Sequence, residues 1–345
     1  MKSFNIGEIQ VGIGEKTLVI PEIGINHGGS LKVACEMAEA AARAGARLIK
    51  HQTHIIEDEM SCEAKKVVPG NSVKSIYDVM SECALNETEE FDFMKYVESL
   101  GMEFISTPFS RAAANRLEKF GVKAYKIGSG ELNNYPLIEH VASFGKPMII
   151  STGMNSIIEI ERAVDILERK NVPYALLHCT NLYPTKPEQV RLGAMVQMMD
   201  HFKDVPIGLS DHTLNNFSCI AAIALGATIV ERHFTDNMNR IGNDIVCSMD
   251  EEHLKELLSA ANEIPSMLGG EKEALKDEKI TSDFAFATVV AIRRIKKGEL
   301  FSKDNIWVKR PGTGQILAKD YEKVLGRKAS CDILCDSHIT WDMVE

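Results

Sequence analysis

The chain has 345 residues, of which 45% are hydrophobic and 26% charged, and its formal net charge is −10. This length suits one large domain plus a small one, and the composition is ordinary for a soluble globular protein. The acidic balance argues against nucleic acid or an anionic membrane as a partner. No apolar run reaches the roughly 18 residues of a membrane-spanning helix, so none is expected.

The amino terminus and the cysteines indicate a cytoplasmic protein. Residues 1–8 lack the basic and apolar regions of a signal peptide. The eight cysteines are scattered singly, without a CxxC pair, which is typical of reduced thiols in a chain of this length. A small anionic substrate remains compatible with the net charge, because a few lysines in a cleft outweigh a diffuse negative surface.

Short apolar runs alternate with amphipathic helical patterns from Thr17 to about Ser266. The predicted strands end near Glu22, Lys50, Ser106, Ile127, Ile150, His178, Leu209 and His233. The predicted helices span residues 31–44, 89–100, 111–120, 135–144, 156–170, 189–202, 217–225 and 250–264. Eight strands, each followed by a helix over roughly 250 residues, predict an α/β fold of the (β/α)₈ TIM-barrel type. A doubly wound open sheet is the alternative, which the count of eight disfavours.

Three segments depart from this alternation. Residues 53–87 are too many for a plain βα loop and are predicted to cover the mouth of the barrel. Residues 266–283 are polar and charged and are interpreted as a linker, so that the barrel domain occupies residues 1–265. Residues 284–345 contain short β-rich runs and turn signals, which predict a small second domain of mainly irregular β structure.

Two histidines mark the predicted active end of the barrel. His212 and His233 each follow a short apolar run, and a helical segment separates the two runs. This βαβ pattern places both imidazoles at the carboxyl end of the sheet, where barrels hold their chemistry. Neutral imidazole is a common ligand of divalent metals, so the pair predicts a metal site, although either histidine alone could be structural.

Other polar side chains follow the remaining predicted strands. Two lysines with several hydroxyls and glycine-flanked amides suit a ligand that carries a phosphate and a carboxylate. A serine or threonine at a strand end also caps helices, whereas a lysine directly after a buried run needs a partner. Glu22 and Glu131 are candidates for proton transfer or for holding substrate hydroxyls. The strand-end set comprises Lys50, Gln52, Thr107, Lys126, Ser129, Ser151, Asn181 and Ser210.

Several motifs in order resemble the bacterial sialic acid synthases, also called N-acetylneuraminate synthases. The motifs are EIGINH at 22–27, KHQT at 50–53, STPFS at 106–110, KIGSGE at 126–131, GLSDHT at 208–213 and ERHF at 231–234. The resemblance covers essentially the whole chain. It includes KRPG at 309–312, which is similar to the antifreeze-like (SAF) domain that closes this family.

The resemblance implies an enzyme that condenses phosphoenolpyruvate with N-acetylmannosamine and water, giving N-acetylneuraminate and phosphate by C–O cleavage. It implies that His212 and His233 bind a divalent metal, usually Mn²⁺, with Mg²⁺ or Co²⁺ as alternatives. It implies a homodimer in which the carboxyl-terminal domain is swapped onto the partner's barrel. The legionaminic and pseudaminic acid branches use the same chemistry on other acetamido sugars, and the animal-type branch uses a 6-phosphate.

The resemblance also implies roles for individual residues. Phosphoenolpyruvate would contact Lys50, Thr107, Lys126, Ser129, Ser151, Asn181 and Ser210. The sugar would contact Gln52, Asn71, Tyr183, Phe284 and Arg310, the last two from the swapped domain. The catalytic carboxylates would be Glu22, Glu131 and Asp244. The 52–54 and 57–60 segments look most similar to the N-acetylneuraminate branch.

Two other functions stay open on the residues alone. A Schiff-base aldolase would use Lys126 or Lys50 as its nucleophile. A non-catalytic sugar-binding or ice-binding protein is suggested only by the antifreeze-like segment, and it leaves the paired histidines and the lysines unexplained.

Overall fold

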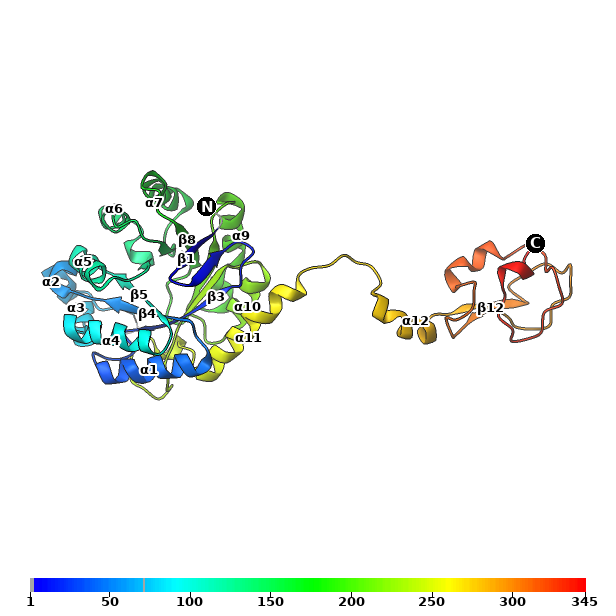
Figure 1. The fold of residues 1–345 in the computed structure, drawn as a ribbon, viewed down its shortest axis with the longest axis horizontal. Coiled ribbons are helices and arrows are strands. Elements are labelled where there is room, and N and C mark those ends of the chain that lie inside the picture. Colours follow the sequence, from blue (N-terminus) through cyan, green and yellow to red (C-terminus); the bar gives the residue numbers. More distant parts are fainter. Residues whose placement is uncertain (1–2, 71) are drawn as a thin grey trace. The chain divides into compact units, whose positions relative to one another are not determined.

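A computed structural model describes residues 3–70 and 72–345 of the chain (Figure 1). The chain folds as two compact units, Met1–Gly269 and Gly270–Glu345. Among the described residues, no helix combines the length and apolar character that crossing a membrane requires.

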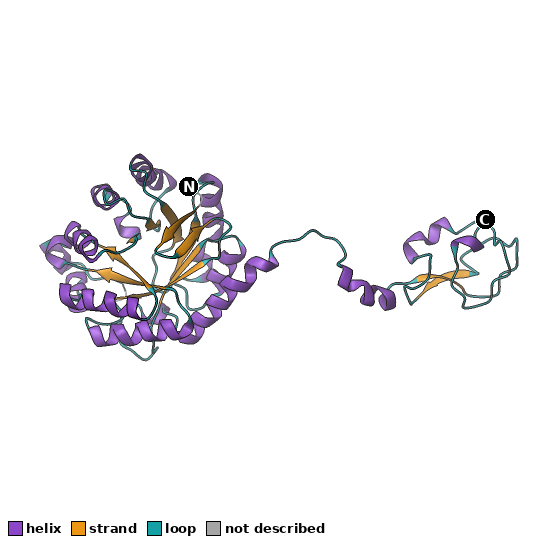
Figure 2. Ribbon diagram, in the orientation of Figure 1, coloured by secondary structure: helices purple, strands orange, loops and turns teal. Residues whose placement is uncertain are grey.

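The first unit is a closed barrel of eight parallel strands, which confirms the predicted TIM barrel (Figure 2). The strands follow one another in sequence order around the barrel, and β10 pairs with β3 to close it. The strands are β3 (Leu18–Gly24), β4 (Leu48–Thr53), β5 (Glu103–Pro108), β6 (Tyr125–Ile127), β7 (Met148–Ser151), β8 (Tyr174–Cys179), β9 (Ile207–Asp211) and β10 (Ile229–His233). All eight occur where the apolar runs predicted them.

Helices surround this barrel because each parallel connection must cross from one strand end to the other. Helix α1 shows how the sequence sets their limits: the Ser30 side chain accepts a hydrogen bond from the Val33 amide, and Gly45 ends the helix with φ +98°. The outer layer comprises α1 (Leu31–Ala44), α4 (Glu87–Ser99), α5 (Arg111–Phe120), α6 (Tyr135–Ala142), α7 (Ile157–Arg169), α9 (Leu192–His201), α10 (Phe217–Ala224) and α11 (Glu251–Met267).

The inner face of the barrel changes from apolar to polar along each strand. On β4, for example, side chains alternate, so that Leu48, Lys50 and Gln52 share one face. Leu48 belongs to a buried apolar cluster with Leu18, Ile105 and Ile229. Lys50 and Gln52, farther along the same strand, line a cavity at the carboxyl end.

An antiparallel hairpin that the sequence analysis did not predict closes the amino-terminal end. It consists of β1 (Ser3–Ile6) and β2 (Ile9–Gly12), with Phe4 opposite Val11. Its Phe4, Ile6, Ile9 and Val11 side chains are buried in the same apolar cluster as the lower barrel residues. The hairpin therefore closes the barrel beneath its inner apolar layer.

The helix predicted over residues 189–202 is broken in two, α8 (Pro187–Val190) and α9 (Leu192–His201). Arg191 lies between them in the left-handed region, with φ +54°. Two carbonyls that would accept backbone amides in a continuous helix accept side-chain hydrogen bonds here. Thr180 Oγ1 donates to the carbonyl of Gln189, and His178 Nε2 donates to that of Val190. These tertiary contacts override the helical periodicity.

The described part of the long connection after β4 contains three short helices. They are α2 (Ile56–Glu59), the 3₁₀ helix η1 (Cys62–Lys66) and α3 (Ile76–Cys83). The prediction that this segment covers the barrel mouth agrees with the structure, since it contributes part of the cavity wall: Pro69, Gly70, Ile76, Val79 and Met80.

The second unit contains a small antiparallel pair, β11 (Thr288–Ala291) and β12 (Ile306–Lys309), within otherwise irregular structure. The limits predicted for the two domains stay predictions, but residues 266–283 are not irregular throughout. Helix α11 continues past Pro265 to Met267, and η4 (Lys276–Glu278) and α12 (Lys279–Ala285) follow. Two further 3₁₀ helices, η5 (Ala318–Lys323) and η6 (Trp341–Met343), complete the unit.

Candidate active site

A cavity of about 790 Å³ opens at the carboxyl end of the barrel. The candidate residues of the first unit that the structure describes all line it. They are Glu22, Lys50, Gln52, Thr107, Lys126, Ser129, Glu131, Ser151, Asn181, Tyr183, Ser210, His212, His233 and Asp244. Asn71 lies outside the described residues, and Phe284 and Arg310 belong to the second unit.

Two lysines and two glutamates form the floor of this cavity, and all four are buried. Lys50 Nζ lies 2.7 Å from Glu22 Oε1 and 3.5 Å from Glu231 Oε2. Lys126 Nζ lies 3.4 Å from Glu231 Oε1 and donates to Ser151 Oγ at 2.7 Å. The ion pairs keep buried charges from being unpaired, which would be costly.

The pKa values of the floor residues follow from burial and from these neighbours. Burial alone would raise the pKa of Glu22, but Lys50 and His233 lower it well below its usual range. Burial would lower the pKa of Lys50, but Glu22 and Glu231 raise it above its ordinary value. Burial lowers the pKa of Lys126, and Glu231 only partly offsets this effect.

Glu231 is a site residue that the sequence analysis missed. It bridges both lysines and accepts a hydrogen bond from Ser210 Oγ at 3.0 Å. A signal was present, because Glu231 lies two residues before His233 and period-two alternation places both side chains on the inner face.

Hydroxyl and amide groups surround the lysines and have unused hydrogen-bonding capacity. Thr107 Oγ1 and Asn181 Oδ1 are buried and have no hydrogen-bond partner among the described residues. Ser129 Oγ accepts from the Gly153 amide at 3.0 Å. Because buried polar atoms are nearly always paired, the two unpaired atoms indicate a polar ligand in the cavity that the lysines also line.

Because Gly153 has no side chain, it leaves room for the side chains of Asn181 and Ser129. A Cβ at Gly153 would lie 1.8 Å from Asn181 Oδ1 and 2.9 Å from Ser129 Oγ. We predict that Gly153→Ala displaces Asn181 and weakens by about tenfold the binding of phosphoenolpyruvate, the ligand that the sequence resemblance implies, as measured by calorimetry. Gly130→Ala is the matched control, since Gly130 lines the same cavity and its Cβ would meet no atom within 4 Å. Equal losses in both variants would contradict this explanation.

His212 and His233 face each other across the cavity, with ring centroids 5.3 Å apart. The His212 Nδ1 atom lies 2.9 Å from the carbonyl of Thr180, which places a hydrogen on Nδ1 and leaves Nε2 as the nitrogen that would bind a metal. His233 Nδ1 is buried without a hydrogen-bond partner and lies 3.9 Å from Glu22 Oε2 and 4.0 Å from Asp244 Oδ2. This donor chemistry fits a divalent metal.

The protein provides few metal ligands of its own. Within residues 3–70 and 72–345, no group of three or more His, Cys, Asp or Glu side chains has the geometry of a metal site. The two imidazoles would therefore hold a metal only together with water or substrate oxygens, which is how open catalytic sites are built. The metal assignment stays a prediction.

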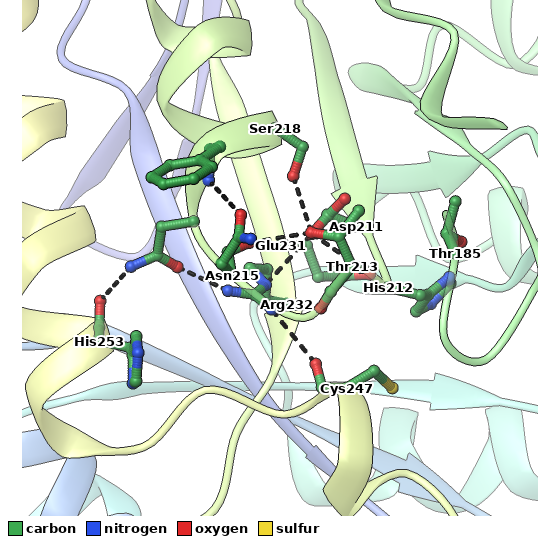
Figure 3. A network of polar contacts seen from close by, with 12 residues as sticks. Thr185, Asp211, His212, Thr213, Asn215, Ser218, Glu231, Arg232, Cys247 and His253 are labelled. Atoms are coloured by element: carbon green, nitrogen blue, oxygen red, sulfur yellow. Dashed lines mark hydrogen bonds and ion pairs between the residues drawn. The ribbon is translucent and has the colours of Figure 1, made fainter. Parts of the chain in front are cut away.

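A buried ion pair holds the two histidine-bearing strand ends in place (Figure 3). Arg232 Nε lies 3.2 Å from Asp211 Oδ2, and these residues directly precede His233 and His212. Arg232 also donates to Asn216 Oδ1 and to the carbonyl of Thr213, both at 2.6 Å. The guanidinium thus ties the loop after β9 to the end of β10.

Glu131 has a carboxyl group whose pKa is close to neutral pH. It ends the 3₁₀ helix η2 (Ser129–Glu131), and burial, followed by the charge of Glu59, raises its pKa to about 7. Its carboxylate folds back so closely that a Cβ on Gly128 would lie 2.5 Å from Oε2. A group with this pKa can both donate and accept a proton at neutral pH.

Comparison with known proteins relates both units to one family. The model of the NeuB family matches residues 37–273, and that of the SAF domain matches residues 286–345, which confirms the predicted second domain. The N,N'-diacetyllegionaminic acid synthase of Campylobacter jejuni is 37% identical over 92% of this chain and 96% of its own length. The human N-acetylneuraminate-9-phosphate synthase is 30% identical over 97% of this chain and 94% of its own.

A solved structure agrees with these relatives. The N-acetylneuraminic acid (sialic acid) synthetase of Leptospira borgpetersenii, in complex with citrate, superposes with a TM-score of 0.73 at 30% identity. The alignment covers 81% of this chain and 95% of that one.

Proposed function

Because the chain belongs to the NeuB family, whose members are phosphoenolpyruvate-using sugar-acid synthases, we propose that it condenses phosphoenolpyruvate with N-acetylmannosamine to give N-acetylneuraminate and phosphate. The observation that carries the proposal is the buried lysine pair beneath unsatisfied hydroxyl and amide groups, beside two facing imidazoles. Phosphoenolpyruvate carries the phosphate and carboxylate that such a floor suits.

The chemistry assigns a task to each part of the cavity. Carbon three of phosphoenolpyruvate forms the new C–C bond with the aldehyde carbon of the open-chain sugar, whose oxygen takes a proton. Water adds to the cationic carbon two, and the resulting tetrahedral intermediate expels phosphate by C–O cleavage. Lys50 and Lys126 hold the anionic groups, while Glu131 moves the proton at the sugar oxygen or at the added water.

The remaining groups hold and polarise the sugar. A divalent metal bound to His212 and His233, with Mn²⁺ as the expected ion, would act as a Lewis acid on the aldehyde. Gln52, Tyr183 and Asp244 line the cavity and are proposed to contact the sugar; Tyr183 packs against His212, and Asp244 lies 4.0 Å from His233. Glu22 keeps Lys50 charged and accepts a hydrogen bond from Gln52 Nε2 at 2.8 Å.

A second sugar is a candidate because of one relative. The 37% identical Campylobacter protein is an N,N'-diacetyllegionaminic acid synthase. The same site chemistry would serve 2,4-diacetamido-2,4,6-trideoxymannose, since the reacting aldehyde is unchanged. The two sugars differ in the groups that they carry away from the reacting carbon, so the lysine floor does not discriminate between them.

Phosphate release from phosphoenolpyruvate with Mn²⁺ tests the proposal. N-acetylmannosamine, its 6-phosphate and the diacetamido sugar are compared at equal concentration. Fast release with N-acetylmannosamine alone supports the proposal, and a preference for the diacetamido sugar moves the activity to the second candidate. No release with any sugar, together with borohydride trapping of pyruvate on a lysine, would replace it with a Schiff-base aldolase.

We further propose a homodimer in which the second unit completes the partner's site. Phe284 is 60% exposed and Arg310 is exposed on the second unit, and a guanidinium recognises acyl oxygens well.

We also propose a cytoplasmic location. The free state of all eight cysteines supports a reducing compartment.

Mixing two variants that are each impaired tests the swap. We predict that Arg310→Ala lowers kcat/KM by about 10- to 100-fold, because a charged hydrogen bond is lost. Mixing it under subunit exchange with Glu131→Gln should restore up to about a quarter of wild-type turnover, because one site of each mixed dimer has both groups intact. If mixing restores no activity, the second unit does not act on its partner.

A further inference from the structure

We propose that His54 and Glu59 are positioning residues that fix the amide of Gln52 in one orientation at the sugar site. The sugar role of Gln52 rests on the proposed function, whereas the contacts do not. His54 follows β4, and Glu59 ends helix α2 in the segment at the cavity mouth. Neither residue lines the cavity, so neither would be found by its contact with a substrate.

Four side chains form a continuous hydrogen-bonded chain. Gln52 Nε2 donates to Glu22 Oε1 at 2.8 Å, and Gln52 Oε1 lies 3.2 Å from His54 Nε2. His54 Nδ1 lies 2.8 Å from Glu59 Oε2. The His54 and Glu59 side chains are only 1% and 8% exposed, so water does not compete strongly for these bonds.

The direction of each hydrogen bond follows from the Lys50–Glu22 ion pair at one end of the series. Lys50 Nζ lies 2.7 Å from Glu22 Oε1, and the carboxylate of this ion pair only accepts, so the amide nitrogen of Gln52 faces it. The amide oxygen then faces His54, and Nε2 of the ring must donate. Glu59 also accepts, so Nδ1 must donate as well. Both ring nitrogens of His54 thus face oxygen acceptors, and this arrangement requires a hydrogen on each of them.

Packing holds this arrangement on both sides. The His54 ring stacks on Phe109, with centroids 4.4 Å apart and planes 13° apart, and Phe109 lines the cavity. Asp58, beside Glu59 on α2, accepts a hydrogen bond from the Ala112 amide at 2.7 Å. Helix α2 is thus attached both to the chain that ends on Gln52 and to the first turn of α5.

The consequence for a substrate is a defined polarity. With one N–H and one carbonyl lone pair engaged, Gln52 has one N–H and one lone pair left to offer to a ligand. If His54 lost the hydrogen on Nε2, that nitrogen would face the amide oxygen lone pair to lone pair, and only the bond to Glu22 would still favour this orientation of Gln52. A flipped amide would place its oxygen against Glu22 and present the wrong group to the sugar.

Substitutions of Glu59 test this with a matched control on the same helix. Glu59→Gln replaces the carboxylate that accepts from Nδ1 by an amide, and we expect the KM for the sugar to rise about tenfold while the KM for phosphoenolpyruvate changes less than about twofold. Glu57→Gln makes the same change on an exposed residue and should leave both constants unchanged. Equal rises in both KM values for Glu59→Gln would mean a general structural role and overturn the proposal.

His54 itself allows a sharper comparison. In His54→Gln the side-chain amide can place an N–H where Nε2 stood, whereas in His54→Asn it stands where Nδ1 stood. We expect the first variant to keep the KM for the sugar within about threefold of wild type and the second to raise it about tenfold. The reverse order, or equal effects, would show that the Nε2 donor does not position Gln52.

A measurement without turnover separates this inference from the proposed function. Nitrogen-15 NMR of the ligand-free wild type should show a hydrogen on both His54 ring nitrogens, and Glu59→Gln should lose one of them. A His54 ring with one hydrogen in the wild type would overturn the positioning chain, even if phosphate release confirms the synthase. Failure of every sugar in the assay would reject the proposed function. The NMR result would still decide whether His54 and Glu59 position Gln52.

Discussion

Replacing His233 by alanine should lower manganese-dependent phosphate release by at least about a thousandfold, because metal assistance supplies several kcal/mol to such reactions. The site offers two imidazoles and no third protein ligand within the described residues, so removing one leaves a single donor. Calorimetry with Mn²⁺ alone should show weakened metal binding, while the affinity for phosphoenolpyruvate in the absence of metal changes little.

The control for this variant is a histidine outside the cavity. His201→Ala removes an exposed imidazole that pairs with Glu161 on the outer helices, and it should leave metal binding and turnover unchanged. Chelator-treated wild-type protein that retained full activity without added metal would contradict the role of both cavity histidines.

Replacing Glu131 by glutamine should lower kcat by about 10²- to 10⁴-fold, the range typical of a lost general acid or base. Glutamine has nearly the same shape but cannot exchange a proton. Phosphoenolpyruvate binding should persist, because the lysine floor is intact. Glu139→Gln, a change on the exposed face of α6, should retain wild-type turnover. Unchanged kcat in Glu131→Gln would remove this residue from the proton transfer.

The same variant has a predictable effect on stability. The pKa of Glu131 is raised from 4.5 to about 7 in the folded protein, first by burial and then by Glu59. The folded state therefore holds a proton that the unfolded chain has already released, and stability falls as pH rises from about 4.5 to about 7. The loss amounts to about 3 kcal/mol. Denaturation of the ligand-free protein at several pH values should show this decline in the wild type and a smaller decline in Glu131→Gln.

The barrel could be predicted from the sequence because every one of its strands is buried on both faces. Such strands appear as continuous apolar runs, and the capping glycines separate them clearly from the helices. The β1–β2 hairpin escaped prediction because its strands have four residues each and lie outside the repeating pattern. The break at Arg191 depends on side chains of the loop after β8, which periodicity does not report.

Most of the candidate site could be predicted from the sequence, as most of the fold could. Residues at the ends of predicted strands do converge on one cavity, because parallel strands end at the same edge. Glu231 was missed although alternation places it on the inner face two residues before His233. The hydrogen bonds that link Gln52 to Glu59 through His54 could not be predicted, since they depend on how the α2 segment folds back over β4.

The hairpin of β1 and β2 also determines how molecules pass through the barrel. It closes the amino-terminal end over buried apolar side chains, so entry and exit use the carboxyl end. A molecule resting on the lysine floor must then arrive before the one above it and depart after it. Steady-state kinetics should accordingly be sequential and ordered, with the deeper reactant adding first, and the barrel's closed end is what imposes that order.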